Sequence, residues 1–173
     1  MIIVLVGYTG SGKTNIGKKL AKKLDLNFID LNQFIETKEG LSISKILEKK
    51  GDIYFRKIEA KYFRDIIKNN KELVFSLGAG TPCYSDNSKY LSDKNIKSIY
   101  LKSSINSLVN KLFEIKYSTP NLSENYNKDE LKNYIAKHLF ERDIFYKKSQ
   151  FLIDCDNKSE ENLISEILIK LDK

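Results

Sequence analysis

The sequence predicts an α/β fold in which a five-stranded parallel sheet carries helices on both faces. One observation is the opening run IIVLV, which is apolar and mostly β-branched, as expected of a parallel strand covered on both sides. A second is that short apolar runs alternate with amphipathic helical segments, which indicates repeated strand–helix units. A third is that no repeat and no linker divides the 173 residues, a length that suits a single domain.

In the first half of the chain, strands and helices can be predicted one by one from the spacing of apolar residues. The expected elements are a central strand at 2–6, an amphipathic helix at 15–24, a short strand at 28–30 and a helical region at 33–69. Gly40 and Gly51 interrupt that last region, and Ser42 has the side chain of a helix N-cap. The region therefore predicts two or three helices rather than one.

The second half repeats the alternation around a polar stretch. The expected elements are strands at 73–77, 96–101 and 151–153 and helices at 104–115, 129–146 and 160–171. Between two of these helices, residues 116–128 (KYSTPNLSENYNK) have little apolar content, which is typical of a surface loop. We expect this segment to act as a lid.

The net charge of +7 is spread along the chain rather than concentrated. All but three of the 30 basic residues are lysines, and acidic residues lie between many of them. This pattern is typical of solvated helix faces and argues against a nucleic-acid partner. Because arginine is rare here, Arg56, Arg64 and Arg142 are candidates for places that require a planar, bidentate donor.

Composition also limits the compartment and the metal chemistry that we expect. The longest apolar run, 1–6, is far too short to span a bilayer, and no basic segment precedes it. We therefore expect a cytoplasmic protein that binds no membrane, and we expect a monomer. Cys83 and Cys155 form no CxxC pair, so neither a disulfide framework nor a zinc site is predicted. The single histidine, His138, has no other ligand near it in the sequence, and we expect no metal role for it.

A complete phosphate-binding motif follows the first strand. Residues 7–14 (GYTGSGKT) match G-x-x-x-x-G-K-[ST] in full and lead into a helix, which is the context that the motif requires. Three glycines let backbone N–H groups face phosphate oxygens, namely Gly7, Gly10 and Gly12. We expect Lys13 to bridge the β- and γ-phosphates of ATP, Thr14 to bind Mg²⁺, and Ser11 to contact the same nucleotide. The sequence therefore predicts ATP as co-substrate and Mg²⁺ as cofactor.

Four further features occur in the order found in one enzyme family. They are Asp30-Leu31-Asn32, FRKIE at 55–59, GAGTP at 78–82, and Arg142 with Tyr146. Together with the phosphate-binding loop they resemble the shikimate kinase family over nearly the whole chain. The resemblance implies a P-loop kinase fold that transfers the γ-phosphoryl group of ATP to the 3-hydroxyl of shikimate, a small-molecule substrate of aromatic amino-acid biosynthesis.

The resemblance also implies roles for individual residues. Asp30 would hold Mg²⁺ through water, and Arg56 would bind the shikimate carboxylate with Arg142 beside it. The rarity of arginine supports this assignment, because planar paired donors suit a carboxylate. The turn after the third strand would contact the substrate and the γ-phosphate through Gly78, Ala79 and Gly80.

Glu59 lies three residues after Arg56 on the same expected helix. At that spacing its carboxylate can orient the guanidinium. The alternative is an exposed ion pair within one helix, which would contribute little to stability and nothing to binding.

Four positions depart from the family's pattern. Asn32 stands where the family has an aspartate, and Ala79 stands where it has a glycine. Leu77 replaces a threonine, and Thr119 replaces a lid arginine that reaches the phosphates. Asn32 remains a candidate catalytic residue, because its amide can still hydrogen-bond the acceptor hydroxyl. It cannot take the proton of that hydroxyl. The lost lid arginine matters more, because a cation on the transferring group can change the rate by orders of magnitude. Thr119 itself stays a candidate ATP contact, and Lys111 or Lys116 can supply the charge.

Three other functions are compatible with the sequence. The chain can be a kinase of another small hydroxy acid such as gluconate, a catalytically weak nucleotide-binding protein that acts as a switch, or a nucleic-acid binder. The last rests on net charge alone. ATP turnover with and without shikimate separates the leading hypothesis from all three.

Overall fold

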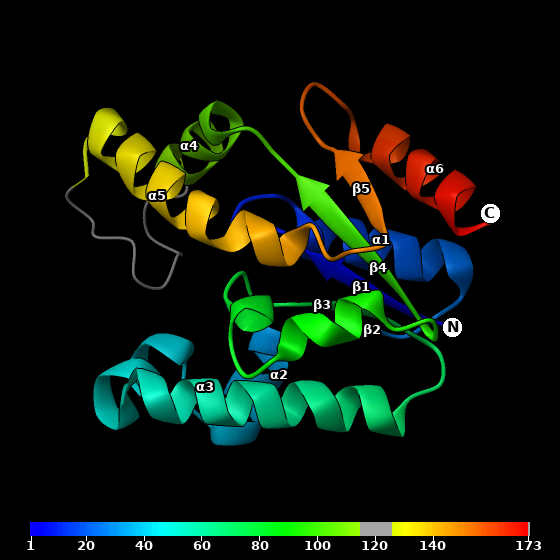
Figure 1. Ribbon diagram of the computed structural model, residues 1–173, viewed down its shortest axis with the longest axis horizontal. Helices are drawn as coiled ribbons and strands as arrows, with labels where there is room; N and C mark the ends of the chain where they lie inside the picture. The colour runs from blue at the N-terminus through cyan, green and yellow to red at the C-terminus, as the bar shows by residue number, and fades with distance from the viewer. Residues whose placement is uncertain (115–125, 173) are drawn as a thin grey trace.

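The computed structural model describes residues 1–114 and 126–172. Five parallel strands form one sheet in the order β2-β3-β1-β4-β5 (Figure 1). The strands are β1 (Ile2–Val6), β2 (Phe28–Asp30), β3 (Leu73–Ser76), β4 (Ile96–Lys102) and β5 (Phe151–Asp154). The predicted fold class is confirmed, and β1 is the central strand because it pairs with both β3 and β4.

Helices connect the strands close to where the sequence predicts them. They are α1 (Lys13–Leu24), α2 (Leu31–Glu39), α3 (Ile43–Asn69), α4 (Ile105–Glu114), α5 (Lys128–Tyr146) and α6 (Glu160–Leu171). The Ser42 side chain caps α3 by accepting from the Lys45 N–H at 3.3 Å, and Gly51 breaks that helix with a φ of 81°. Two short 3₁₀ helices, η1 (Thr81–Cys83) and η2 (Asn87–Ser92), were not predicted, because they lack the apolar periodicity of longer elements.

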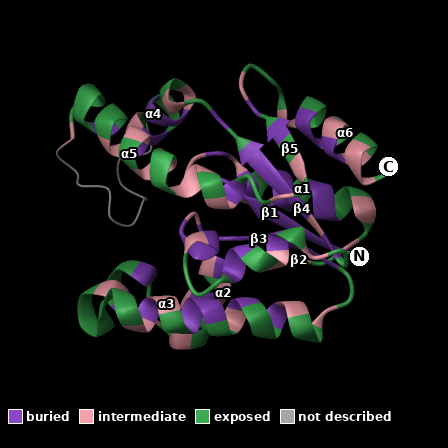
Figure 2. Ribbon diagram, in the orientation of Figure 1, coloured by how far each residue is buried: buried purple, intermediate pink, exposed green. Residues whose placement is uncertain are grey.

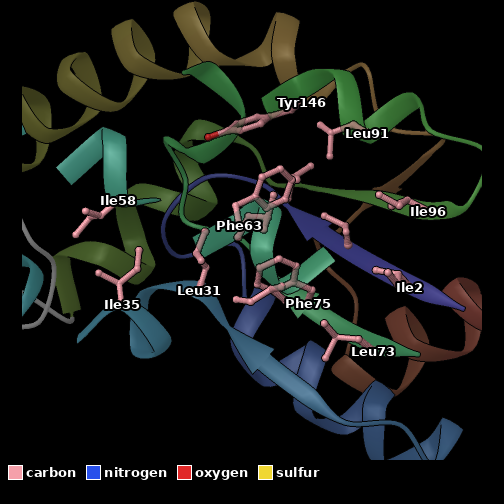
Figure 3. Packing of buried hydrophobic residues seen from close by; sticks show 14 of the residues in the cluster. Ile2, Leu31, Ile35, Ile58, Phe63, Leu73, Phe75, Leu91, Ile96 and Tyr146 are labelled. Carbon is pink, nitrogen blue, oxygen red and sulfur yellow. The ribbon is translucent and has the colours of Figure 1, made fainter. Parts of the chain in front are cut away.

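The residues of β1 alternate between two apolar layers, as the pleat of a strand requires. Ile2, Val4 and Val6 pack with α2, α3, η2 and the end of α5, whereas Ile3 and Leu5 pack with α1 and α6. Figure 2 shows β1 buried throughout, and Figure 3 shows the first layer gathered around Phe63 and Phe75. Burial on both faces is why β1 reads as an unbroken apolar run.

The carboxyl ends of the parallel strands bring several predicted groups to one edge of the sheet. The phosphate-binding loop follows β1, Asp30 ends β2, and the GAGTP turn follows β3. Residues 116–125 of the predicted lid lie outside the described residues, and Lys128 at the end of that segment already belongs to α5. Within the ranges described, the structure contains no helix of the length and hydropathy needed to cross a membrane.

Candidate functional site

The loop between β1 and α1 makes a tight turn against β4. Gly7 has a φ of 148°, and a Cβ at this position would lie 2.6 Å from the Leu101 carbonyl oxygen. Only glycine fits there without displacing backbone. Further along the loop, the Ser11 N–H donates to the Tyr8 carbonyl at 3.1 Å. The loop is therefore closed on itself before α1 begins at Lys13.

The Lys13 ammonium group is buried beneath this loop. Its Nζ donates to the carbonyl oxygens of Gly7 and Tyr8, each at 2.9 Å. Burial lowers the pKa of Lys13 to about 8, and the nearby Asp30 carboxylate opposes that shift. Charged phosphate oxygens are stronger acceptors than carbonyls. Lys13 is thus placed to exchange its present partners for a bound phosphate.

Thr14 and Asp30 meet beside the loop. Thr14 Oγ1 donates to Asp30 Oδ2 at 2.7 Å, while Asp30 Oδ1 accepts from the N–H groups of Asn32 at 3.0 Å and Gln33 at 3.4 Å. The second set of bonds caps α2 and fixes the carboxylate so that one oxygen faces Thr14.

The same pair is the best candidate for a metal site. Among the described residues, no group of three or more His, Cys, Asp or Glu side chains could enclose a metal ion. Mg²⁺ takes only one or two protein ligands and fills the rest of its shell with water and substrate phosphates. A hydroxyl that faces a carboxylate next to a phosphate-binding loop fits that requirement, so Thr14 and Asp30 suit Mg²⁺.

A cavity of about 390 Å³, here called the phosphate cavity, adjoins these groups. Its lining includes the predicted phosphate and metal residues Gly10, Gly12, Lys13, Thr14 and Asp30, together with Lys111 of α4. Gly7 and Ser11 do not line it. Ser11 Oγ is buried, and in the part of the chain that the structure describes it has no hydrogen-bond partner. Six of the residues predicted to contact ATP or its metal therefore share one cavity.

A second cavity, of about 150 Å³, lies next to the first and is here called the acceptor cavity. Charged side chains reach it from Arg56 and Glu59 of α3 and from Arg142 of α5. The turn after β3 contributes Gly78, Ala79 and Gly80, and an apolar wall is formed by Ile43, Leu47 and Phe55. Two guanidinium groups beside an apolar wall suit a small organic acid.

Arg56 is held in place from several sides. Its Nη1 donates to Glu59 Oε2 at 2.8 Å, and its Nε lies 3.3 Å from Asp52 Oδ1. Its Cζ lies 4.2 Å from the centroid of the Tyr84 ring. The side chain of Arg56 is 18% exposed and that of Glu59 is 2% exposed, so the two do not form an exposed ion pair on a helix face.

The turn after β3 is tied to the same carboxylate. Thr81 Oγ1 donates to Glu59 Oε1 at 2.6 Å, so Glu59 joins the turn to Arg56 through its two oxygens. A Cβ at Gly80 would lie 2.8 Å from Arg56 Nη1. A side chain at this position would therefore displace the guanidinium from where it now lies.

Arg142 enters the acceptor cavity from α5. Its Cζ lies 5.6 Å from the centroid of the Tyr8 ring. The neighbouring Asp143 pairs with Lys147 and Tyr100 instead, and within the described residues no carboxylate forms an ion pair with Arg142. Arg142 is therefore a half-buried cation whose charge is available to a ligand. One turn further, Tyr146 donates to the Ala79 carbonyl at 2.6 Å and joins α5 to the turn after β3.

The two cavities share a wall. Four residues line both of them, namely Thr9, Asn32, Gly78 and Ala79. Asn32 fits closely against the turn, because a Cβ at Gly78 would lie 2.8 Å from Asn32 Oδ1. Ligands in the two cavities would both lie against these four residues, Asn32 among them.

Several side chains of the acceptor cavity were not expected from the sequence, and three of them carry polar rings: Tyr8, Tyr134 and His138. Tyr134 and His138 precede Arg142 by two turns and one turn of α5, so the helical repeat places all three on one face. That spacing is the signal that could have found two of them. Tyr8 occupies a variable position of the phosphate motif, so nothing in the sequence indicated that it would line this cavity.

The remaining predicted residues lie elsewhere. Thr119 and Lys116 are outside the described residues. Arg64 donates to the Ser85 carbonyl and lines neither cavity. Cys83 and Cys155 are free thiols, and burial raises the pKa of each to about 11, which keeps them protonated.

Comparison with known proteins gives a consistent result over almost the full length. The family model described as shikimate kinase matches residues 9–172. The shikimate kinase of Flavobacterium psychrophilum is 42% identical over 165 residues, which span 95% of each chain.

Solved structures agree with the sequence comparison. The shikimate kinase from Bacteroides thetaiotaomicron has a TM-score of 0.92 at 28% identity, with 100% of this chain and 99% of that chain covered. The shikimate kinase from Acinetobacter baumannii in complex with shikimate has a TM-score of 0.86 at 27% identity, with 99% and 94% covered. Both comparisons cover almost the whole of this chain.

Proposed function

Because this chain belongs to the shikimate kinase family, whose members are ATP-dependent kinases, we propose that it phosphorylates the 3-hydroxyl of shikimate. The observation that carries the proposal is the wall between the two cavities, with Lys13 on one side and Arg56 and Arg142 on the other. This arrangement suits transfer from an anionic phosphate chain to an anionic acceptor. The product would continue toward the aromatic amino acids.

We assign the nucleotide to the phosphate cavity. The N–H groups of the loop and the positive end of α1 attract its phosphates, and Lys13 turns from the Gly7 and Tyr8 carbonyls to phosphate oxygens. Lys111 adds a second cation from α4. Mg²⁺ held by Thr14 and Asp30 would offset charge on the β- and γ-phosphates.

We assign shikimate to the acceptor cavity. Arg56 and Arg142 bind its carboxylate, and the apolar side chains of the wall pack against its carbon ring. Glu59 holds the Arg56 guanidinium in position from one side, which leaves the other N–H groups for the ligand. Asn32, on the shared wall, donates or accepts a hydrogen bond with the reacting hydroxyl.

The reaction then follows from position and charge. The 3-hydroxyl oxygen bonds to the γ-phosphorus, the bond from that phosphorus to the bridging oxygen breaks, and its electron pair leaves on ADP. The hydroxyl proton passes to an oxygen of the transferred phosphoryl group and from there to water. Asn32 does not accept it, because an amide is not a base at neutral pH. A loose transition state needs little base assistance, so the reaction depends mainly on positioning by Asn32 and on charge stabilisation by Lys13 and Lys111.

We further propose that the protein acts as a monomer in the cytoplasm and that its chain forms one domain. Support for a single domain comes from the two cavities, because segments from both halves of the chain line each of them. Light scattering on the purified protein tests the oligomeric state, and fractionation of cells that express it tests the compartment.

The proposed reaction is tested by measuring ADP release with shikimate, with gluconate and with no acceptor. Rapid release that requires shikimate, together with an NMR spectrum that places the phosphate on the 3-oxygen, is the expected result. Release with gluconate alone would assign the chain to another acceptor. ATP binding without turnover on either acid would favour a nucleotide-binding protein and contradict the proposal.

A further inference from the structure

One face of α5 carries a row of side chains that enter the acceptor cavity. Tyr134, His138 and Arg142 follow one another at four-residue spacing, and all three line the cavity. The Tyr134 and His138 rings meet edge to face, with their centroids 4.1 Å apart. The imidazole therefore lies one helical turn from a guanidinium that we assign to the acceptor.

The phosphate-binding loop holds this imidazole through Tyr8. The Tyr8 hydroxyl lies 3.3 Å from His138 Nδ1. Tyr8 is only 4% exposed, and burial raises its pKa to about 12, so the hydroxyl keeps its proton and needs an acceptor inside the protein. Among the described residues that acceptor is Nδ1. Since Nδ1 accepts, the proton of the neutral ring belongs on Nε2.

Among the described residues, the second ring nitrogen is then a donor without a partner. In the ranges that the structure covers, His138 Nε2 makes no hydrogen bond. Burial and the Arg142 charge lower the pKa of His138 below its usual value, so the ring is neutral at pH 7. A neutral N–H donor beside two guanidinium groups adds a directed hydrogen bond without a third positive charge.

We propose that His138 binds the acceptor directly, its Nε2–H donating to an acceptor oxygen, and that Tyr8 holds the imidazole in the tautomer that can donate. The proposal rests on the assignment of the acceptor to this cavity. It makes His138 a third polar anchor, beside Arg56 and Arg142. Tyr8 is a positioning residue, since it acts through His138.

Tyr8 also connects the two cavities. Its carbonyl accepts from Lys13 Nζ at 2.9 Å, and its hydroxyl bonds to His138 on the other side of the ring. One residue of the phosphate-binding loop therefore contacts both the lysine of the phosphate cavity and the donor of the acceptor cavity.

NMR of the imidazole tests the tautomer directly, because His138 is the only histidine in the chain. Long-range ¹H–¹⁵N spectra of the wild-type protein at pH 7.5 should show a protonated Nε2 and an unprotonated Nδ1. Saturating shikimate with ADP should shift the Nε2 signal, and Tyr8→Phe should mix the two tautomers. A protonated Nδ1 in the wild type, or an Nε2 signal that does not respond to shikimate, would overturn the proposal.

Kinetics test the contact with a matched pair of variants. His138→Phe keeps an aromatic ring of similar shape without nitrogens, and we expect it to raise the shikimate KM about tenfold while the ATP KM stays within about twofold. His138→Gln restores an N–H donor and should recover most of that loss. Tyr8→Phe should have a smaller effect, and adding it to His138→Phe should cost nothing further.

These outcomes separate the proposal from its alternatives. If His138 only packs α5 against the loop, His138→Phe should leave the shikimate KM unchanged, or change both KM values together with the melting temperature. Either result would overturn the contact. Failure of the wild-type protein to phosphorylate shikimate would instead refute the proposed reaction, and the NMR titration would then be repeated with the acid that is phosphorylated.

Discussion

The two cavities are built in different ways. The phosphate cavity takes its central groups from one continuous loop and the helix that follows it, whereas the acceptor cavity collects Arg56, Gly80 and Arg142 from three distant segments. A continuous motif is fixed by local backbone geometry. An assembled cavity depends on the packing of α3, the turn after β3 and α5, so its geometry is a property of the whole fold.

Their electrostatics differ as well. Lys13 is a buried cation whose hydrogen bonds go to neutral carbonyls, so an incoming phosphate improves its surroundings. Arg56 is already paired with Glu59 and Asp52 before any ligand binds. Lys13 therefore gains charge compensation when a ligand binds, whereas Arg56 is positioned in advance.

The largest effect is expected from Lys13→Ala. Removal of the ammonium beneath the loop should lower kcat by about a thousandfold or more, because charge on the transferring phosphoryl group is then less well compensated. Circular dichroism should show an intact fold, since among the described residues the lysine bonds only to loop carbonyls. Near-normal turnover by the folded variant would remove Lys13 from the mechanism.

Arg56→Lys sharpens the comparison, because it should affect one cavity alone. Lysine keeps the charge but loses the paired planar hydrogen bonds, so the shikimate KM should rise roughly ten- to a hundredfold while the ATP KM changes less than about twofold. Arg64→Lys is the matched control, since Arg64 lies outside both cavities. Equal effects of the two substitutions would contradict the assignment of Arg56.

The charge of Lys13 makes a prediction about pH. Without nucleotide its pKa is lowered to about 8, and bound phosphates raise it, so only the free protein loses this proton as pH rises through 8. ATP affinity should therefore be nearly constant below pH 7 and fall about tenfold between pH 7 and pH 9. Calorimetry should detect proton uptake on binding in that range. Affinity that is flat to pH 9 would show that Lys13 is protonated throughout.

The link between the turn and α3 is tested by Thr81→Val, with Thr81→Ser as its control. Valine leaves Glu59 Oε1 buried without its donor, which should cost about 1–3 kcal/mol of stability and raise the shikimate KM severalfold. Serine keeps the hydroxyl and should behave like the wild type. Chemical denaturation and steady-state kinetics measure the two effects, and a valine variant of unchanged stability would mean that the bond contributes little.

The sequence predicted the sheet, the helices and the phosphate-binding loop because each depends on neighbouring residues. The unbroken apolar run of β1 favours a buried strand, and the glycines of the loop permit its turn, without help from distant residues. The roles of Arg56 and Arg142 came from family resemblance, and nothing local indicated that Thr81 would bond to Glu59 across 22 positions. The hydrogen bond between Tyr8 and His138, which are 130 residues apart, was missed for the same reason, since only the packed fold brings the two side chains together.

The most direct test of the two-cavity arrangement compares shikimate with its methyl ester as acceptor for the wild-type protein and for Arg56→Lys. The ester has no charged carboxylate for Arg56 and Arg142 to bind, so its KM in the wild type should exceed that of shikimate by about a hundredfold, with the ATP KM unchanged. In Arg56→Lys the difference between the two acceptors should shrink, because one of the paired donors is already gone. Equal KM values for acid and ester in the wild type would contradict the carboxylate site on which the proposed function rests.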